Sequence, residues 1–187
     1  MRIVGVDDGA FHPNKKLKQH ALLLAVLFKD IQIVTLRMNR IEVDGRDANK
    51  VLMSLLKRMR YDVVMLSGVS FGGFNVVDIA KLSNAVRRPV MALTGEKPDN
   101  KAVRNALRGH FEDWEKRWRM VQAAGRMHSF KPLRDEPPLY FEVRGASPSL
   151  AKKWIVATAR ISRLPEPIRV ARIMARGLSE LSQVSLP

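Results

Sequence analysis

The chain has 187 residues, of which 46% are hydrophobic and 27% are charged. This composition is typical of a globular protein with one core, and no apolar run approaches the roughly 18 residues that a membrane-spanning helix needs. The absence of cysteine excludes disulfides, thiolate zinc sites and a cysteine nucleophile. No basic segment leads into an apolar one at the N-terminus, so we expect no signal peptide and a cytoplasmic location.

The formal net charge is +15, because 33 Lys and Arg residues stand against 18 Asp and Glu residues. A basic excess of this size favours a polyanionic partner, and nucleic acid is the commonest one. A charged surface that serves solubility alone is the alternative.

Three predicted strands open the chain, with links short enough for an antiparallel meander. They run from Arg2 to Asp7, from His20 to Phe28 and from Ile31 to Met38, and a turn-rich basic stretch at 12–16 separates the first two. Apolar residues then recur at helical spacing from Val51 to Met59. Asp47 or Asn49 is placed to cap this helix.

Helices and strands alternate in the second half. A continuous apolar strand from Asp62 to Ser67 is of the kind that is buried on both faces. The remaining predicted elements are a helix from Asn75 to Val86, a strand from Pro89 to Leu93, a long helix from Lys101 to Ala124, an edge strand or ribbon from Leu139 to Val143, and helices from Pro148 to Ala159 and from Glu166 to Leu181. This order predicts an α/β protein with the ribonuclease H-like fold, a mixed five-stranded sheet with helices on both faces and a central first strand.

Carboxylates stand at the ends of these predicted strands. Asp7 and Asp8 close the first strand, Asp44 and Asp47 follow the third, and Asp78 lies on the helix predicted from Asn75 to Val86. Strand alternation sends Asp7 and Asp8 to opposite faces, and the pattern does not decide which one faces a cleft. Clustered carboxylates repel one another unless a cation neutralises them. Oxygen ligands suit Mg²⁺ or Mn²⁺, which activates water and stabilises charge at a scissile phosphate.

Each of these acids also has a structural interpretation. Asp8 and Asp44 each precede a glycine and could form turns. Asp47 could cap a helix, and Asp78 could face solvent or pair with an arginine. Both interpretations stay open at the level of sequence.

The segment SGVSFGGFN, residues 67–75, is rich in glycine. Gly68, Gly72 and Gly73 would let backbone amides approach a ligand closely. A flipped base needs such a pocket together with a stacking ring, for which Phe71 or Phe74 is available. A plain strand-to-helix turn is the alternative.

Three stretches together resemble a known family. They are VGVDDGAF, IEVDGRDA leading to SGVSFGGFNVVDIA, and SRLPEPIRVARIMARG. They resemble the archaeal endonuclease dU family, which is similar to endonuclease V, a ribonuclease H-like, Mg²⁺-dependent repair nuclease that nicks DNA beside a deaminated base. The resemblance covers nearly the whole chain and implies a single endonuclease V-like domain over residues 1–187 that acts at deoxyuridine.

The resemblance also implies roles for individual residues. Asp7 matches the first-strand metal ligand, and Asp44 lies where endonuclease V has a metal-binding Glu, so these two are the implied catalytic pair. Ser67 lies where endonuclease V has its next Asp, and Arg172 where it has a His or Asp. With two positions changed, Asp7 and Asp44 remain as implied metal ligands, and Asp8, Asp47 or Asp78 is expected to supply a missing one. The implied substrate-binding residues are Gly68, Phe71, Gly72, Gly73, Asn75 and Arg172.

The sequence thus predicts a DNA-repair endodeoxyribonuclease that uses Mg²⁺ or Mn²⁺, with DNA, or else RNA, as its partner. The alternative is a non-catalytic nucleic-acid-binding relative that has lost part of the metal site, with Arg172 supplying positive charge there. A third possibility is a basic scaffold protein whose acids are structural.

Overall fold

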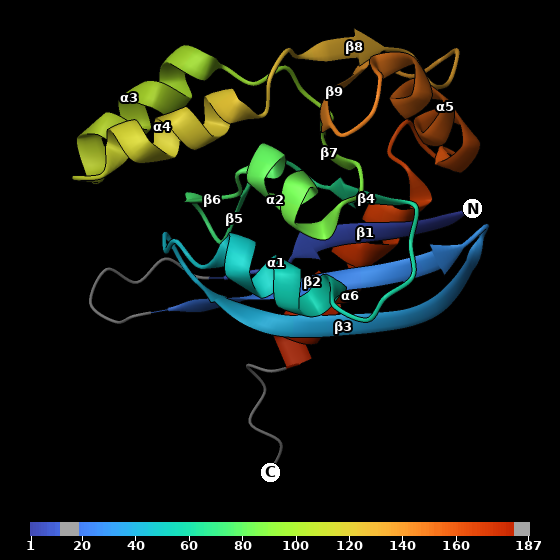
Figure 1. The fold of residues 1–187 in the computed structure, drawn as a ribbon, viewed down its shortest axis with the longest axis horizontal. Helices are drawn as coiled ribbons and strands as arrows, with labels where there is room; N and C mark the ends of the chain where they lie inside the picture. The colour runs from blue at the N-terminus through green and yellow to red at the C-terminus, as the bar shows by residue number, and fades with distance from the viewer. Residues whose placement is uncertain (12–18, 182–187) are drawn as a thin grey trace.

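The computed structural model describes residues 1–11 and 19–181. Within them lie a seven-stranded mixed sheet of order β3-β2-β1-β4-β7-β9-β8 and a two-stranded ribbon, β5-β6 (Figure 1). The strands are β1 Arg2–Asp8, β2 His20–Lys29, β3 Gln32–Glu42, β4 Val63–Leu66, β5 Ser70–Phe71, β6 Asn75–Val76, β7 Val90–Thr94, β8 His128–Phe130 and β9 Leu139–Arg144. The helices are α1 Ala48–Leu56, α2 Ile79–Val86, α3 Asn100–His110, α4 Trp114–Ala123, α5 Pro148–Thr158 and α6 Glu166–Leu181. The turn-rich stretch predicted at 12–16 lies outside the described residues.

The first strand lies inside the sheet, as predicted. Strand β1 pairs antiparallel with β2, which pairs antiparallel with β3, so the predicted meander is confirmed. On its other side β1 pairs parallel with β4, and β4 pairs parallel with β7. Val6 lies opposite Leu66 in this register, so Asp7 and Ser67 leave the sheet side by side at the same edge.

The sheet is wider than the predicted five strands. Strand β9, predicted as an edge strand, lies between β7 and β8 and pairs antiparallel with both. The additional edge strand β8 has three residues, too few to show an alternating pattern in the sequence. Glu142, in the middle of β9, is thereby placed opposite Ala92 of β7 inside the sheet.

Helices cover both faces of the sheet (Figure 1). The larger apolar core joins α1 and α2 to one face, and α5 and α6 pack on the other face. No helix in the described part of the chain combines the length and the apolar character needed to cross a membrane.

Helix α6 lies close to β1 because β1 carries a glycine. A Cβ atom at Gly5 would overlap the backbone carbonyl of Pro167, in the first turn of α6. Only glycine allows two backbones to approach so closely. The close approach brings the side chain of Arg172, later on α6, to the end of β1.

The long helix predicted from Lys101 to Ala124 is interrupted. Helix α3 ends at His110 and α4 begins at Trp114. Phe111 adopts extended backbone angles between them, and its ring packs edge-on against Phe74 with 5.7 Å between the centroids. At this break, the helical segment formed by α3 and α4 therefore packs against the glycine-rich loop, residues 67–75.

Candidate functional site

Asp7 is the buried acid at the end of β1, with only 4% of its surface exposed. Its Oδ1 accepts hydrogen bonds from the Ser67 hydroxyl at 2.5 Å and from the Asp8 backbone N–H at 2.9 Å. Its Oδ2 accepts from Nε of Arg172 at 2.7 Å. Strand β4 and helix α6 thus both contribute a partner to this carboxylate.

Asp8 faces the glycine-rich loop and accepts a hydrogen bond from the Gly72 backbone N–H at 2.6 Å. Burial raises the pKa of Asp8 to about 6; the bond from Gly72 opposes this rise, and the negative charge of Asp7 adds to it. Both acids nevertheless line one cavity of about 530 Å³, which Ser67 also lines. The end of β1 therefore presents the two carboxyl groups together, which alternation along a regular strand does not predict.

Helix α6 supplies the opposite wall of this acidic cavity. Arg172, Arg176 and Glu180 all line it, and they recur at every fourth position along the helix. Residues four apart share a helix face. This spacing was the available signal for Arg176 and Glu180, which the sequence interpretation did not identify.

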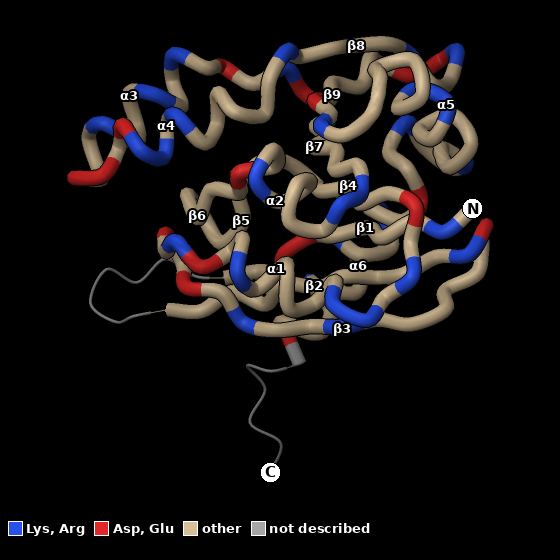
Figure 2. The backbone as a smooth tube through the Cα atoms, viewed as in Figure 1, with Lys and Arg blue, Asp and Glu red and all other residues tan. Residues whose placement is uncertain are grey.

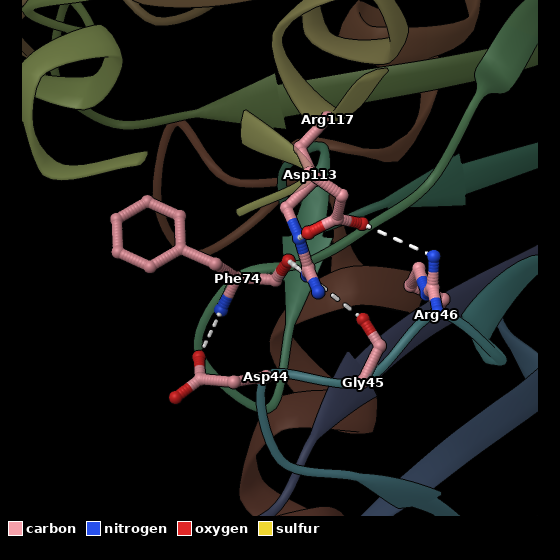
Figure 3. Close-up of polar contacts among 6 residues, drawn as sticks. All are labelled: Asp44, Gly45, Arg46, Phe74, Asp113 and Arg117. Atoms are coloured by element: carbon pink, nitrogen blue, oxygen red, sulfur yellow. Dashed lines mark hydrogen bonds and ion pairs between the residues drawn. The ribbon is translucent and has the colours of Figure 1, made fainter. Parts of the chain in front are cut away.

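Asp44 is attached to the glycine-rich loop. Its backbone lies in the left-handed region at φ 57°, and its N–H donates to the Gly72 carbonyl at 2.8 Å. Its Oδ1 accepts from the Phe74 N–H at 2.8 Å, while its other oxygen points away from the loop (Figure 3). A side chain at Gly73, whose φ is +81°, would overlap this carboxylate. Asp44 is not among the residues that line the acidic cavity, and its role as a metal ligand stays a prediction.

Arg117 joins the loop that follows β3 to the glycine-rich loop (Figure 3). It is 6% exposed and donates to the carbonyls of Gly45 at 2.9 Å and Phe74 at 2.6 Å. Its Nε pairs with Asp113 at 2.8 Å, and Arg46 lies 3.5 Å from the same carboxylate. Burial alone would raise the pKa of Asp113, but the hydrogen bond and charge of Arg117 outweigh it and hold the pKa below its ordinary value.

Asp47, Asn75 and Asp78 have structural partners. Asn75 is fully buried; its Nδ2 donates to Asp47 at 2.6 Å, and its Oδ1 accepts from the Ala48 N–H at 3.1 Å. Asp78 caps α2 by accepting from the Lys81 N–H at 2.9 Å. The expected cap by Asp47 was wrong, because its side chain makes no capping bond to α1 and binds Asn75 instead. Asp78 caps α2, a structural role other than the expected exposure to solvent or pairing with arginine. The roles of all three side chains in binding metal or substrate stay predictions.

A second cavity, of about 250 Å³, lies on the other side of Ser67. Gly68 and Phe74 line it, whereas Phe71 is 1% exposed and packs in the core. Between the two candidate stacking rings, the structure therefore favours Phe74. Glu142 also lines this cavity, and burial raises its pKa to about 7. The sequence showed Glu142 only as one acid in a strand, because its place depends on the pairing of β7, β9 and β8.

The donor set at the acidic cavity suits a hard cation that needs few protein ligands. Residues 1–11 and 19–181 contain no group of three or more His, Cys, Asp or Glu side chains arranged to hold a metal. Mg²⁺ usually takes one or two carboxylates and completes its shell with waters and substrate phosphates. Asp7 and Asp8 provide such a pair, and Arg172, whose side chain is 41% exposed, can leave Asp7 for solvent.

The mixed sheet, with adjacent acids at the end of its internal first strand, gives the protein a ribonuclease H-like fold similar to that of endonuclease V. The chain belongs to the endonuclease dU family, whose model matches residues 1–179. A UPF0215 protein of Methanothermobacter thermautotrophicus is 34% identical over 184 residues, which cover 96% of this chain and 88% of that protein.

Solved structures share this fold. A protein of unknown function from Archaeoglobus fulgidus superposes with a TM-score of 0.83 at 26% identity, covering 95% of this chain and 97% of that one. Endonuclease V of Ciona intestinalis, solved with a 24mer DNA containing an inosine followed by a ribo-adenosine, superposes with a TM-score of 0.63 at 13% identity. That match covers 97% of this chain and 87% of the Ciona chain and shows the shared fold. The family is thus that of an endonuclease by its description, and the fold is shared with endonuclease V.

Proposed function

We propose that the chain is an endodeoxyribonuclease that requires Mg²⁺ or Mn²⁺ and cuts DNA next to a deaminated base, with deoxyuridine as the first candidate. The observation that carries this proposal is the acidic cavity, where Asp7 and Asp8 face Arg172 and Arg176. Carboxylates and guanidinium groups gathered around one space are suited to a cation and a phosphate together.

The side chains of the cavity divide into two roles. Asp7 and Asp8 would hold the divalent cation, which when bound supplies an activated water and stabilises charge at the phosphate. Arg172 and Arg176 would bind phosphate oxygens, for which the planar guanidinium is well matched. Ser67 orients Asp7 through its hydroxyl hydrogen bond.

DNA is the proposed partner because of charge and fold. Lys and Arg residues occur along most elements of the molecule (Figure 2), in agreement with the net charge of +15. The Ciona endonuclease V of similar fold was solved with inosine-containing DNA. We extend nucleic-acid binding to this chain by analogy of fold, and the basic surface supports that extension.

The proposal is tested with labelled oligonucleotide duplexes that contain one deoxyuridine. The wild type is expected to nick them with Mg²⁺ or Mn²⁺ and to stop when a chelator is added. Asp7→Asn keeps the size of the side chain but removes its charge, so we expect cleavage to fall by at least about 100-fold. Gel separation of the products measures the rate and the cut position, and duplexes without the lesion and RNA of matched sequence define the substrate.

Asp62→Asn is the matched control. Asp62 lies at the opposite end of the same strand pair and accepts a hydrogen bond from the Arg2 N–H at 2.7 Å, which an asparagine oxygen can also accept. Its activity should equal that of the wild type. Cleavage that persists in Asp7→Asn or in chelator would contradict the proposal.

The Asp7–Arg172 ion pair favours one further candidate function, a nucleic-acid-binding protein without catalysis. With Arg172 at 2.7 Å from Asp7, the charge of the buried carboxylate is already balanced without a metal. Salt-sensitive binding of the duplexes without cleavage under any of these conditions would support this candidate.

A further inference from the structure

The second cavity lies between the glycine-rich loop and the helical segment. Its walls include Ser67 and Gly68 after β4, Phe74 in the loop, Val103 of α3, Val121 of α4 and Glu142 of β9. Ser67 also lines the acidic cavity, so the two spaces adjoin across this residue. A nucleotide with its phosphate at Asp7 and Asp8 would have the second cavity within reach of its base.

Glu142 is the acidic residue among the described residues that line this cavity. It is 9% exposed, and its carboxyl group has no hydrogen-bond partner among residues 1–11 and 19–181. A buried polar group without a partner is costly unless a ligand satisfies it. Glu142 lines an open cavity and its carboxyl oxygens are not fully enclosed, so a ligand that enters the cavity can form hydrogen bonds with them.

Basic groups on the neighbouring elements are engaged elsewhere. Arg144, two positions along β9, donates from Nε to the Ala123 carbonyl at 2.8 Å. His128 of β8 stacks on Phe141, with 5.4 Å between the ring centroids, and Phe141 neighbours Glu142 on the opposite face of β9. The pKa of Glu142 is raised to about 7 by burial alone, with no charged neighbour contributing. The carboxyl group is therefore mostly neutral below neutral pH and about half ionised near pH 7.

A neutral carboxyl group has a particular recognition chemistry. It presents one donor and one acceptor side by side. Uracil and hypoxanthine both carry a lactam edge, a ring N–H next to a carbonyl, which offers the complementary pair. An ionised carboxylate would accept from the N–H but would set its other oxygen against the base carbonyl.

We propose that this cavity receives the deaminated base and that Glu142 binds its lactam edge, accepting from the ring N–H and donating to the adjacent carbonyl. The ring of Phe74 and the side chains of Val103 and Val121 supply apolar contact for the base. The assignment rests on the proposed function, because a base reaches this cavity only when its phosphate lies near Asp7.

The test measures binding, separately from cleavage. Duplexes with deoxyuridine, deoxyinosine or an abasic analogue at one position are titrated in chelator, and fluorescence anisotropy gives each affinity. The wild type should prefer a lactam base over the abasic analogue, and the two lactam arms identify which base the site takes. Glu142→Met should lose at least about tenfold of this preference, because it removes both hydrogen bonds.

Glu142→Gln separates recognition from a merely structural role. Its amide presents a donor and an acceptor, as the neutral carboxyl does, so the preference for the lactam base should remain. In the wild type this preference should fall as the pH rises through about 7, whereas in Glu142→Gln it should stay constant. Glu96→Gln, which changes an exposed acid beyond β7, is the matched control and should behave as the wild type.

Thermal unfolding checks that the variants fold. The folded state holds the proton of Glu142 more tightly than the unfolded state does. The protein is therefore most stable below the unfolded pKa of this group, and it loses this stability as the pH rises through the folded pKa of about 7. Glu142→Gln cannot ionise, so its melting temperature should exceed that of the wild type above neutral pH.

The outcomes separate this inference from the nuclease proposal. A wild-type preference for the lactam base without cleavage would overturn the nuclease and leave the base site in place. Cleavage by the wild type, together with an unchanged preference in Glu142→Met, would overturn the base site and leave the nuclease. Loss of the preference in Glu142→Gln, or a pH dependence that persists in it, would also overturn the role of Glu142.

Discussion

Asp7 carries a negative charge in a buried position next to a second acid. Its carboxylate is buried and adjoins Asp8, and it is stabilised by a serine hydroxyl, a backbone N–H and the guanidinium of Arg172. The raised pKa of Asp8, about 6, shows that burial and the neighbouring charge still disfavour a second negative charge. A divalent cation and Arg172 would relieve the same repulsion, so they should compete for Asp7.

This competition predicts the effect of removing Arg172. Arg172→Gln should raise the affinity for Mn²⁺ by roughly tenfold, because a unit positive charge is removed beside the carboxylate ligand Asp7. The affinity is measured without DNA, by calorimetry or by electron paramagnetic resonance of the free ion. Screening by solvent limits the size of the gain, since Arg172 is 41% exposed.

Arg169→Gln is the control on the same helix. Arg169 pairs with Glu166 at 2.7 Å and does not line the acidic cavity, so its loss should leave Mn²⁺ binding unchanged. If Arg172→Gln bound Mn²⁺ no more tightly than the wild type, the cation would not be bound beside Asp7.

At the scale of elements, the position of α6 sets the geometry of the acidic cavity. The first turn of the helix lies against Gly5, and its next turns carry Arg172 and Arg176 to the carboxyl end of β1. Gly5→Ala would place a methyl group in the backbone of Pro167, which neither strand nor helix can avoid without moving. We expect a loss of about 2 kcal/mol or more in the free energy of unfolding, measured with urea.

Gly177→Ala, in the same helix, tests this explanation. A Cβ atom at Gly177 meets no atom within 4 Å, so alanine there should stabilise α6 by about 0.5–1 kcal/mol. Equal effects of the two substitutions would mean that helix propensity, and not the contact between the two backbones, governs the position of α6.

The elements also show what the sequence could predict. Helix α6 has the predicted bounds, from Glu166 to Leu181, because its amphipathic spacing is a local signal. The interruption at Phe111 was not predictable from spacing, since the ring leaves the helical pattern for a contact with Phe74. A tertiary contact outweighed local propensity there.

In the candidate site, too, local signals were predictable from the sequence and tertiary contacts were not. Adjacent acids after a buried strand identified Asp7 and Asp8 from the sequence. The placement of Glu142 depends on which strands pair. The role of Arg117 depends on its hydrogen bond to the Gly45 carbonyl, 72 positions away in the chain. Neither arrangement leaves a periodic or local signal, so only the folded structure reveals it.

At the scale of the whole molecule, the charge of +15 predicts how DNA binding responds to salt. A protein that contacts several phosphates displaces condensed counterions, so its affinity falls steeply as salt rises. Between 50 and 200 mM salt, the affinity for duplex DNA should fall roughly 1,000-fold if at least about six phosphates are contacted. A flat response would exclude the phosphate backbone as the main ligand of this surface.

The location of the contacts can be resolved with single charges. Arg176 lines the acidic cavity, whereas the exposed Arg60 lies before the start of β4, at the other end of the sheet. If the duplex crosses the acidic cavity, Arg176→Gln should lower the slope of log affinity against log salt by about one, and Arg60→Gln should leave the slope unchanged. The opposite result would place the duplex at the amino ends of β1 and β4. Asp7 and Asp8 could not act on DNA there, because the acidic cavity lies at the carboxyl ends of these two parallel strands.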